Sequence, residues 1–169
     1  ERTNKLSLLA DQKDREGIIA EVPYDEAVKS KILTDYVLLA MSATDNLPQV
    51  LFSYPLSSPE DFLYRHDKRT FYTNFNRQFY DNIGIWDEAF HQAFEYGVTQ
   101  RENECFRSLR FKIDYALNSC DLGVARSYLE LLQKSVCNGD FVKERMHRLV
   151  ALEAKSNRIK LPPYRSDTF

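Results

Sequence analysis

The N-terminal third of the chain alternates short apolar runs with polar turns, which is typical of β-strands. The runs Lys5–Asp11 and Ile18–Val22 flank a polar loop and predict one hairpin. The runs Tyr36–Ala43 and Gln49–Leu56 flank the turn-forming residues Thr44–Pro48 and predict a second hairpin. This part of the chain is therefore expected to form antiparallel β-hairpins.

One short helix interrupts the predicted strands. Asp25 is placed to cap this helix, which would run to about Leu33. Its inner side would carry the apolar residues Ala27, Val28, Ile32 and Leu33. From Ser57 onward the apolar period changes from two residues to about three and a half, which indicates helices.

Ser58–Asp61 has the residues of a helix start, with proline at the first helical position. Phe71, Phe75 and Phe79 recur every four residues, and Asn82–Gly84 is expected to end that helix. The predicted core stripe of the next helix is Trp86, Phe90, Ala93, Phe94 and Gly97.

Three more helices are expected, and a change of pattern at Asn138–Gly139 separates the last two. Their apolar positions are Cys105, Leu109, Ile113, Ala116 and Leu117, then Leu122, Ala125, Leu129, Leu132 and Val136, then Val142, Met146, Leu149 and Val150. The sequence thus predicts a single α+β domain over residues 1–169. Residues 1–56 are expected to be mainly β and residues 57–156 to form four to five helices. Residues 157–169 would be an extended tail that could be a docking segment or a disordered end.

Half of the 22 aromatic residues (11 Phe, 10 Tyr and 1 Trp) fall between Phe62 and Tyr96. One helical core face cannot take so many rings, so some are expected to pack against a second element, to cover a partner or to stand partly exposed. Tyr and Arg are enriched at interface hot spots. The predicted partner-binding residues are Tyr64, Arg65, Arg69, Tyr72, Arg77, Tyr80 and Tyr96.

The same residues suit a second function, because single-strand binders combine cations with stacking rings. Further basic groups follow at Arg101, Arg107, Arg110 and Lys112 and at Lys155, Arg158, Lys160 and Arg165. The net charge of −2 and the pI near 6.0 argue against a dedicated nucleic-acid binder. Contact with RNA or single-stranded nucleic acid is therefore the alternative, and a protein partner is the first choice.

Two Glu-x-x-His motifs, Glu88–His91 and Glu144–His147, have the spacing used by di-metal helical bundles. At 100° per residue, both motifs point away from the apolar stripe of their own helix, so no metal site is predicted. His66 and Asp67 could serve as a catalytic base and its orienting carboxylate, but neighbouring residues on a helix point in different directions, so this pairing is weak. The chain also lacks a G-x-S-x-G motif and a glycine-rich phosphate loop. The sequence predicts no enzyme, no cofactor and no small-molecule substrate.

The cysteines Cys105, Cys120 and Cys137 show no C-x-x-C spacing and are expected to be unpaired thiols in helices. This indicates a reducing compartment, the nucleus or the cytoplasm. No apolar run reaches the ~18 residues of a membrane span. A chain that begins with Glu1 suggests a domain cut from a larger protein. The prediction is an intracellular protein-interaction or assembly module that acts as a scaffold or regulatory subunit of a complex.

Overall fold

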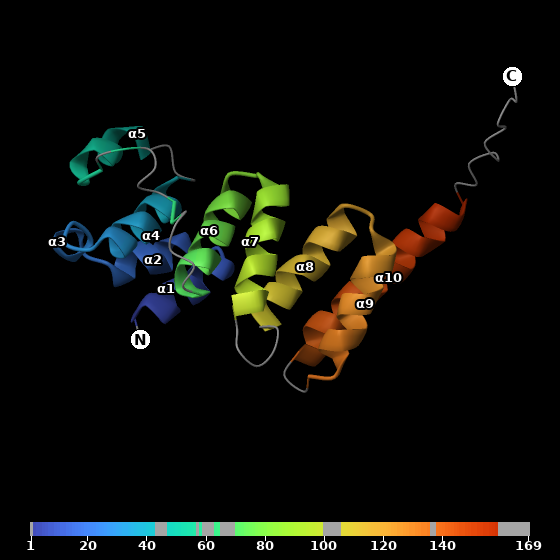
Figure 1. Ribbon diagram of the computed structural model, residues 1–169. Coiled ribbons are helices and arrows are strands. Elements are labelled where there is room, and N and C mark those ends of the chain that lie inside the picture. Colours follow the sequence, from blue (N-terminus) through green and yellow to red (C-terminus); the bar gives the residue numbers. More distant parts are fainter. Residues whose placement is uncertain are drawn as a thin grey trace, which may run out of the picture. The chain divides into compact units, whose positions relative to one another are not determined.

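The computed structural model describes residues 2–42, 47–56, 58, 63–64, 70–99, 106–135 and 138–158. Of these residues 82% are helical and none lies in a strand (Figure 1). The α+β prediction with N-terminal β-hairpins is therefore wrong. Contacts divide the chain into two compact units, residues 1–101 and 102–169, which are described separately here. That residues 1–169 fold as one domain stays a prediction.

The first unit is built around α4, which packs against α1, α2 and α3. Helix α6 packs along α7, and α1 also contacts α6. The elements of this unit are α1 (Arg2–Asp11), α2 (Arg15–Glu21), α3 (Tyr24–Ala27), α4 (Lys31–Met41), α5 (Leu47–Val50), the 3-10 turn η1 (Leu51–Ser53), α6 (Thr70–Asn82) and α7 (Trp86–Thr99).

The first predicted hairpin is a pair of helices, α1 and α2. Leu6, Leu9 and Ala10 have the three-to-four spacing of a helix, and all three pack into the core. The carboxylate of Asp14 accepts a hydrogen bond from the backbone N–H of Gly17 at 2.9 Å and caps α2. The polar loop that suggested a β-turn is thus a helix end followed by a helix cap.

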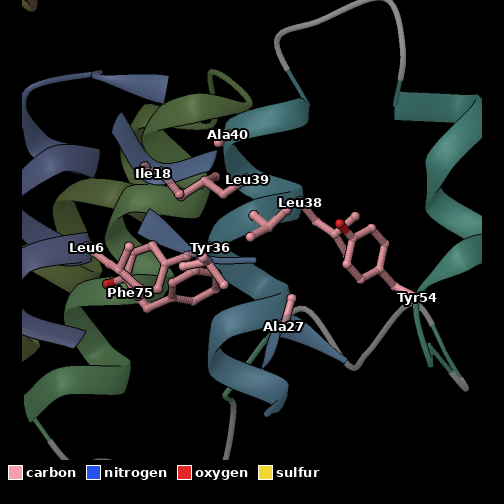
Figure 2. Packing of buried hydrophobic residues seen from close by; sticks show 11 residues of the cluster. Leu6, Ile18, Ala27, Tyr36, Leu38, Leu39, Ala40, Tyr54 and Phe75 are labelled. Carbon is pink, nitrogen blue, oxygen red and sulfur yellow. The ribbon is translucent and has the colours of Figure 1, made fainter. Parts of the chain in front are cut away.

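The run that suggested the first strand of the second hairpin is the buried helix α4. Every residue from Thr34 to Ala40 is buried, so this helix has no polar face to reveal its period. A short apolar run of this kind cannot be told from a buried strand by periodicity alone. Figure 2 shows Tyr36 of α4 between Leu6 and Phe75, and the rings of Tyr36 and Phe75 meet edge to face with centroids 5.0 Å apart.

The other run, Gln49–Leu56, alternates as a strand would but folds as α5 and η1. Phe52 is 90% exposed, whereas Tyr54 is buried against Tyr24 with ring centroids 5.4 Å apart. The predicted turn at 44–48 lies mostly outside the described residues. The predicted helix from Asp25 to Leu33 is also wrong, because α3 stops at Ala27 and α4 starts anew at Lys31.

Helices α6 and α7 confirm the predicted helical period, but the buried face of α7 is different. Its buried residues are Ala89, Ala93 and Tyr96, whereas Trp86 is 48% and Phe94 is 51% exposed. Small alanine side chains let two helix backbones approach closely. The prediction that Trp86 and Phe94 are core residues is therefore wrong. It is confirmed for Phe75, while Phe71, Phe79 and Phe90 are only partly buried. The predicted helix start at Ser58–Asp61 is described only at Ser58.

The second unit holds α8 (Phe106–Asn118), α9 (Leu122–Gln133) and α10 (Gly139–Arg158). Its core contains the predicted residues Leu109, Ile113, Leu129 and Leu132, all of which are buried. In α10 the predicted stripe is correct for Val142 and Leu149, but Val150 is exposed. Two ion pairs also link helices of this unit, Arg145 with Asp114 at 2.8 Å and Arg126 with Glu153 at 2.7 Å.

Candidate partner-binding surface

Tyr64, one of the predicted partner-binding residues, forms hydrogen bonds to both α6 and α4. Its backbone N–H donates to Asn76 Oδ1 at 3.1 Å, and its carbonyl accepts from Asn76 Nδ2 at 3.3 Å. One side chain of α6 therefore holds both backbone polar groups of Tyr64. The Tyr64 ring also meets the buried Phe75 edge to face, with centroids 5.8 Å apart.

The hydroxyl of Tyr64 donates a hydrogen bond of 2.5 Å to Oδ2 of Asp35, a fully buried residue of α4. The same oxygen accepts from Lys31 Nζ at 3.0 Å, and Nζ lies 4.2 Å from the centroid of the Tyr64 ring. Burial and then the hydrogen bond to Asp35 raise the pKa of Tyr64 above its ordinary value of 10.0. The hydroxyl therefore stays protonated and remains a donor at every physiological pH.

Tyr72 stacks on Tyr64 with ring centroids 4.1 Å apart and an interplanar angle of 22°. Both residues are half-buried, so this tyrosine pair (Tyr64 and Tyr72) presents part of its surface to solvent. Phe71 meets Tyr72 edge to face at 5.7 Å. The pair is thus a partly exposed aromatic surface whose rings are fixed by packing.

Arg77, by contrast, is a structural residue of the first unit. It is only 5% exposed, donates from Nε to Asn74 Oδ1 at 3.0 Å and forms an ion pair with Asp11 at the end of α1. Gln78 donates to the same Asp11 oxygen at 2.7 Å. Because a buried arginine with these partners does not face solvent, Arg77 contributes to helix pairing.

The remaining predicted contact residues differ in their placement. Tyr80 is half-buried beside Phe79, with ring centroids 5.8 Å apart, and Tyr96 is buried. Arg65 and Arg69 lie outside the described residues. The structure therefore brings Tyr64 and Tyr72 together and places Arg77 and Tyr96 in the interior.

The basic residues proposed for nucleic-acid contact are partly committed to the fold. Lys112 is buried, with Nζ 5.8 Å from the Tyr128 ring centroid. Arg110 lies over the ring of Phe141 at 4.8 Å. Arg107 is half-buried. Arg101 and the tail residues Lys160 and Arg165 lie outside the described residues.

The two Glu-x-x-His motifs lie in different units and both histidines are exposed, as the helical geometry predicted. His91 Nδ1 lies 3.2 Å from Glu88 Oε1. A hydrogen bond from Gln92 and, to a smaller extent, the interaction with His91 hold the pKa of Glu88 below its usual value of 4.5. Among the described residues, no group of three or more His, Cys, Asp or Glu side chains is arranged to hold a metal ion.

Of the other candidate reactive residues, only Cys120 is described. It is exposed and follows the end of α8 with a φ of +58°, so its expected position inside a helix is wrong. His66, Asp67, Cys105 and Cys137 lie outside the described residues.

Sequence reasoning missed Asp35, Lys31 and Asp11. Lys31 and Asp35 have the i, i+4 spacing of a helical ion pair, but the strand assigned to Tyr36–Ala43 hid that spacing. Contacts such as Asp35 with Tyr64 or Asp11 with Arg77 join residues far apart in the sequence and left no local signal.

The described part of the chain is thus helical, with a partly exposed pair of stacked tyrosines. None of the described helices combines the length and the apolar character needed to cross a lipid bilayer. The chain belongs to the family described as Family of unknown function (DUF6057), whose family model matches residues 1–167. No curated protein and no protein of solved structure matches the chain.

Proposed function

We propose that the chain is a protein-interaction module and that the tyrosine pair is part of its partner-binding surface. The single observation that supports this proposal is the fixed, half-exposed stack of Tyr64 and Tyr72, 4.1 Å apart. Tyrosine offers a large contact area with few rotatable bonds, so an ordered tyrosine loses little conformational entropy on binding. Here that ordering is already present before a partner binds.

The chemistry around the pair favours a protein as the partner. Among the residues that the structure describes, Lys31 Nζ lies 4.2 Å from the Tyr64 ring centroid and is paired with the buried carboxylate of Asp35. Phosphate binding depends on positive charges that are available to the ligand. A partner that covers two tyrosine rings with an apolar or aromatic side chain uses the pair without requiring such charges.

Affinity capture with the intact chain tests the proposal when three forms are compared. These are the unchanged chain, Tyr72→Ala and Phe52→Ala. Phe52 is the matched control because its ring is 90% exposed and lies in a different element. Tyr72→Ala is expected to weaken partner binding by about 2 kcal/mol or more, roughly 30-fold, without unfolding the chain. Phe52→Ala is expected to leave that binding unchanged.

Salt and nuclease separate protein from nucleic acid. Phosphate contacts lose affinity linearly in log salt, by roughly one unit of slope per contact. Binding that survives nuclease and changes little with salt supports a protein partner. Steeply salt-dependent binding to single-stranded RNA or DNA that requires Tyr72 would support the nucleic-acid alternative, and capture that is lost only in Phe52→Ala would refute the proposed surface.

A further inference from the structure

Three pairs of consecutive helices are joined by the same turn. The pairs are α1 with α2, α6 with α7, and α8 with α9. In each turn the second residue after the first helix has a positive φ, +58° at Lys13, +78° at Gly84 and +58° at Cys120. Within the described part of the chain, no other residue has a positive φ.

The backbone hydrogen bonds of the three turns are also the same. In each turn two N–H groups donate back to the preceding helix in the 6→1 and 5→2 pattern of a Schellman motif. The bonds are Asp14 to Leu9 (2.9 Å) and Lys13 to Ala10 (3.1 Å), Ile85 to Tyr80 (3.0 Å) and Gly84 to Asp81 (3.3 Å), and Asp121 to Ala116 (2.9 Å) and Cys120 to Leu117 (3.4 Å).

The second and third hairpins share a register as well as a turn. Cys120 follows Gly84 by 36 residues, and the same offset separates the starts of α6 and α8 (70 and 106) and of α7 and α9 (86 and 122). Buried residues coincide at this offset. The coinciding pairs are Ala89 with Ala125, Ala93 with Leu129, and Tyr96 with Leu132. Aromatic rings coincide at Phe75 with Phe111 and at Phe79 with Tyr115.

The first hairpin shares with the other two the buried positions nearest to the turn. The residue five positions after the positive-φ residue is buried in all three hairpins, as Ile18, Ala89 and Ala125. The residue seven positions before it is also buried in each, as Leu6, Arg77 and Ile113. Equivalent positions on both sides of the turn are thus buried in all three hairpins.

We infer that the chain is assembled from a repeated helical hairpin, with a repeat length of 36 residues between the second and third copies. Helix pairs of 20–45 residues are the units of helical-repeat scaffolds, whose stability comes from the repeats and their nearest neighbours. Such proteins bind partners over surfaces contributed by several repeats. The inference goes beyond the proposed binding role and does not depend on the tyrosine pair.

The repeat is nearly invisible in the sequence. At the offset of 36 residues, the second and third hairpins are identical only at Phe75 and Phe111, Asn82 and Asn118, and Ala89 and Ala125. Sequence comparison alone therefore indicates no internal repeat. What is repeated is the turn and the buried positions, and different side chains fill them.

The first test uses a difference among the three turns at the residue that follows the positive-φ position. Asp14 and Asp121 each cap the following helix, accepting from Gly17 N at 2.9 Å and from Val124 N at 3.3 Å, whereas Ile85 occupies this position before α7. If the turns are equivalent, Ile85→Asp supplies the missing cap and raises the melting temperature by about 2–4 °C. Ile83→Asp is the matched control, since Ile83 and Ile85 are 46% and 50% exposed. Equal loss of stability in both variants would overturn the inference.

The second test inserts a whole repeat. A second copy of residues 85–120 is inserted after Cys120. The inserted segment and the chain that follows it then both begin at the residue after a positive-φ position. The control inserts residues 87–120, two residues fewer, which rotates the following helix by about 200° and turns its buried face outward. The 36-residue insertion is expected to keep the helical signal per residue and a single cooperative melting transition, and the 34-residue insertion to lose them. The inference is overturned if the two insertions behave alike.

Discussion

The hydroxyl of Tyr64 donates to the buried carboxylate of Asp35 at 2.5 Å, across 29 residues of sequence. This bond joins the residue that carries half of the exposed aromatic stack to the most deeply buried helix of the first unit. The tyrosine pair and the core are therefore joined by this hydrogen bond, and a change at Tyr64 is expected to affect both.

Tyr64→Phe is expected to lower the free energy of unfolding by about 1.5–3 kcal/mol, because it removes a donor from a buried charged group. Denaturant unfolding measures the loss. Tyr24→Phe is the control, since the Tyr24 hydroxyl donates to the neutral carbonyl of Ser53 at an exposed position, and about 1 kcal/mol or less is expected there. A larger loss in Tyr24→Phe would contradict the assigned role of Asp35.

Phe75→Ala is expected to cost about 3–5 kcal/mol because the ring is fully buried in the core of the first unit. Trp86→Ala should cost no more than about 1–2 kcal/mol, since about half of that side chain already faces water. Melting curves of the two variants rank the residues. The reverse order would show that Trp86 belongs to the core and contradict its assignment as a half-exposed residue.

Arg77→Leu is expected to destabilise the chain by about 3 kcal/mol, because it removes the buried guanidinium group that pairs with the Asp11 carboxylate. Arg126→Leu is the matched control, since it breaks the ion pair with Glu153 at the surface and should have a far smaller effect. Chemical denaturation of both variants gives the comparison. Similar losses would show that Arg77 is not the buried partner of α1.

The carboxyl group of Glu88 should titrate below its usual value of 4.5, because Gln92 donates to its charged form at 3.0 Å. A depressed folded-state pKa adds stability above the unfolded pKa, and that stability is lost as the pH falls through the folded value. The NMR titration of the Glu88 side chain measures the midpoint directly. In Gln92→Ala the midpoint should rise; an unchanged midpoint would refute this cause.

Sequence patterns predicted the helices after residue 70 because each has an exposed polar face that reveals the helical period. They failed for α4, whose residues from Thr34 to Ala40 are all buried and therefore show no period. They also placed the buried face of α7 on its large rings, because ring size is visible in a sequence and the close approach allowed by Ala89 and Ala93 is not.

For the candidate surface, composition indicated a window of the sequence but not the roles of the residues in it. Tyr64 and Tyr72 meet as a stack, whereas Arg77 turns inward because Asp11, 66 positions earlier, supplies its counter-charge. Such pairing depends on how α1 packs on α6, which no local pattern encodes. The predicted partner residues could therefore be separated into surface and core only once the helices were in place.

The complete burial of the middle of α4 also has a kinetic consequence. Amide hydrogens in this helix are shielded by protein on every side, so solvent reaches them only when the surrounding helices separate. Deuterium uptake between Thr34 and Ala40 therefore follows the global opening of the first unit. The exchange rate of these few amides therefore reports how often the first unit opens under native conditions.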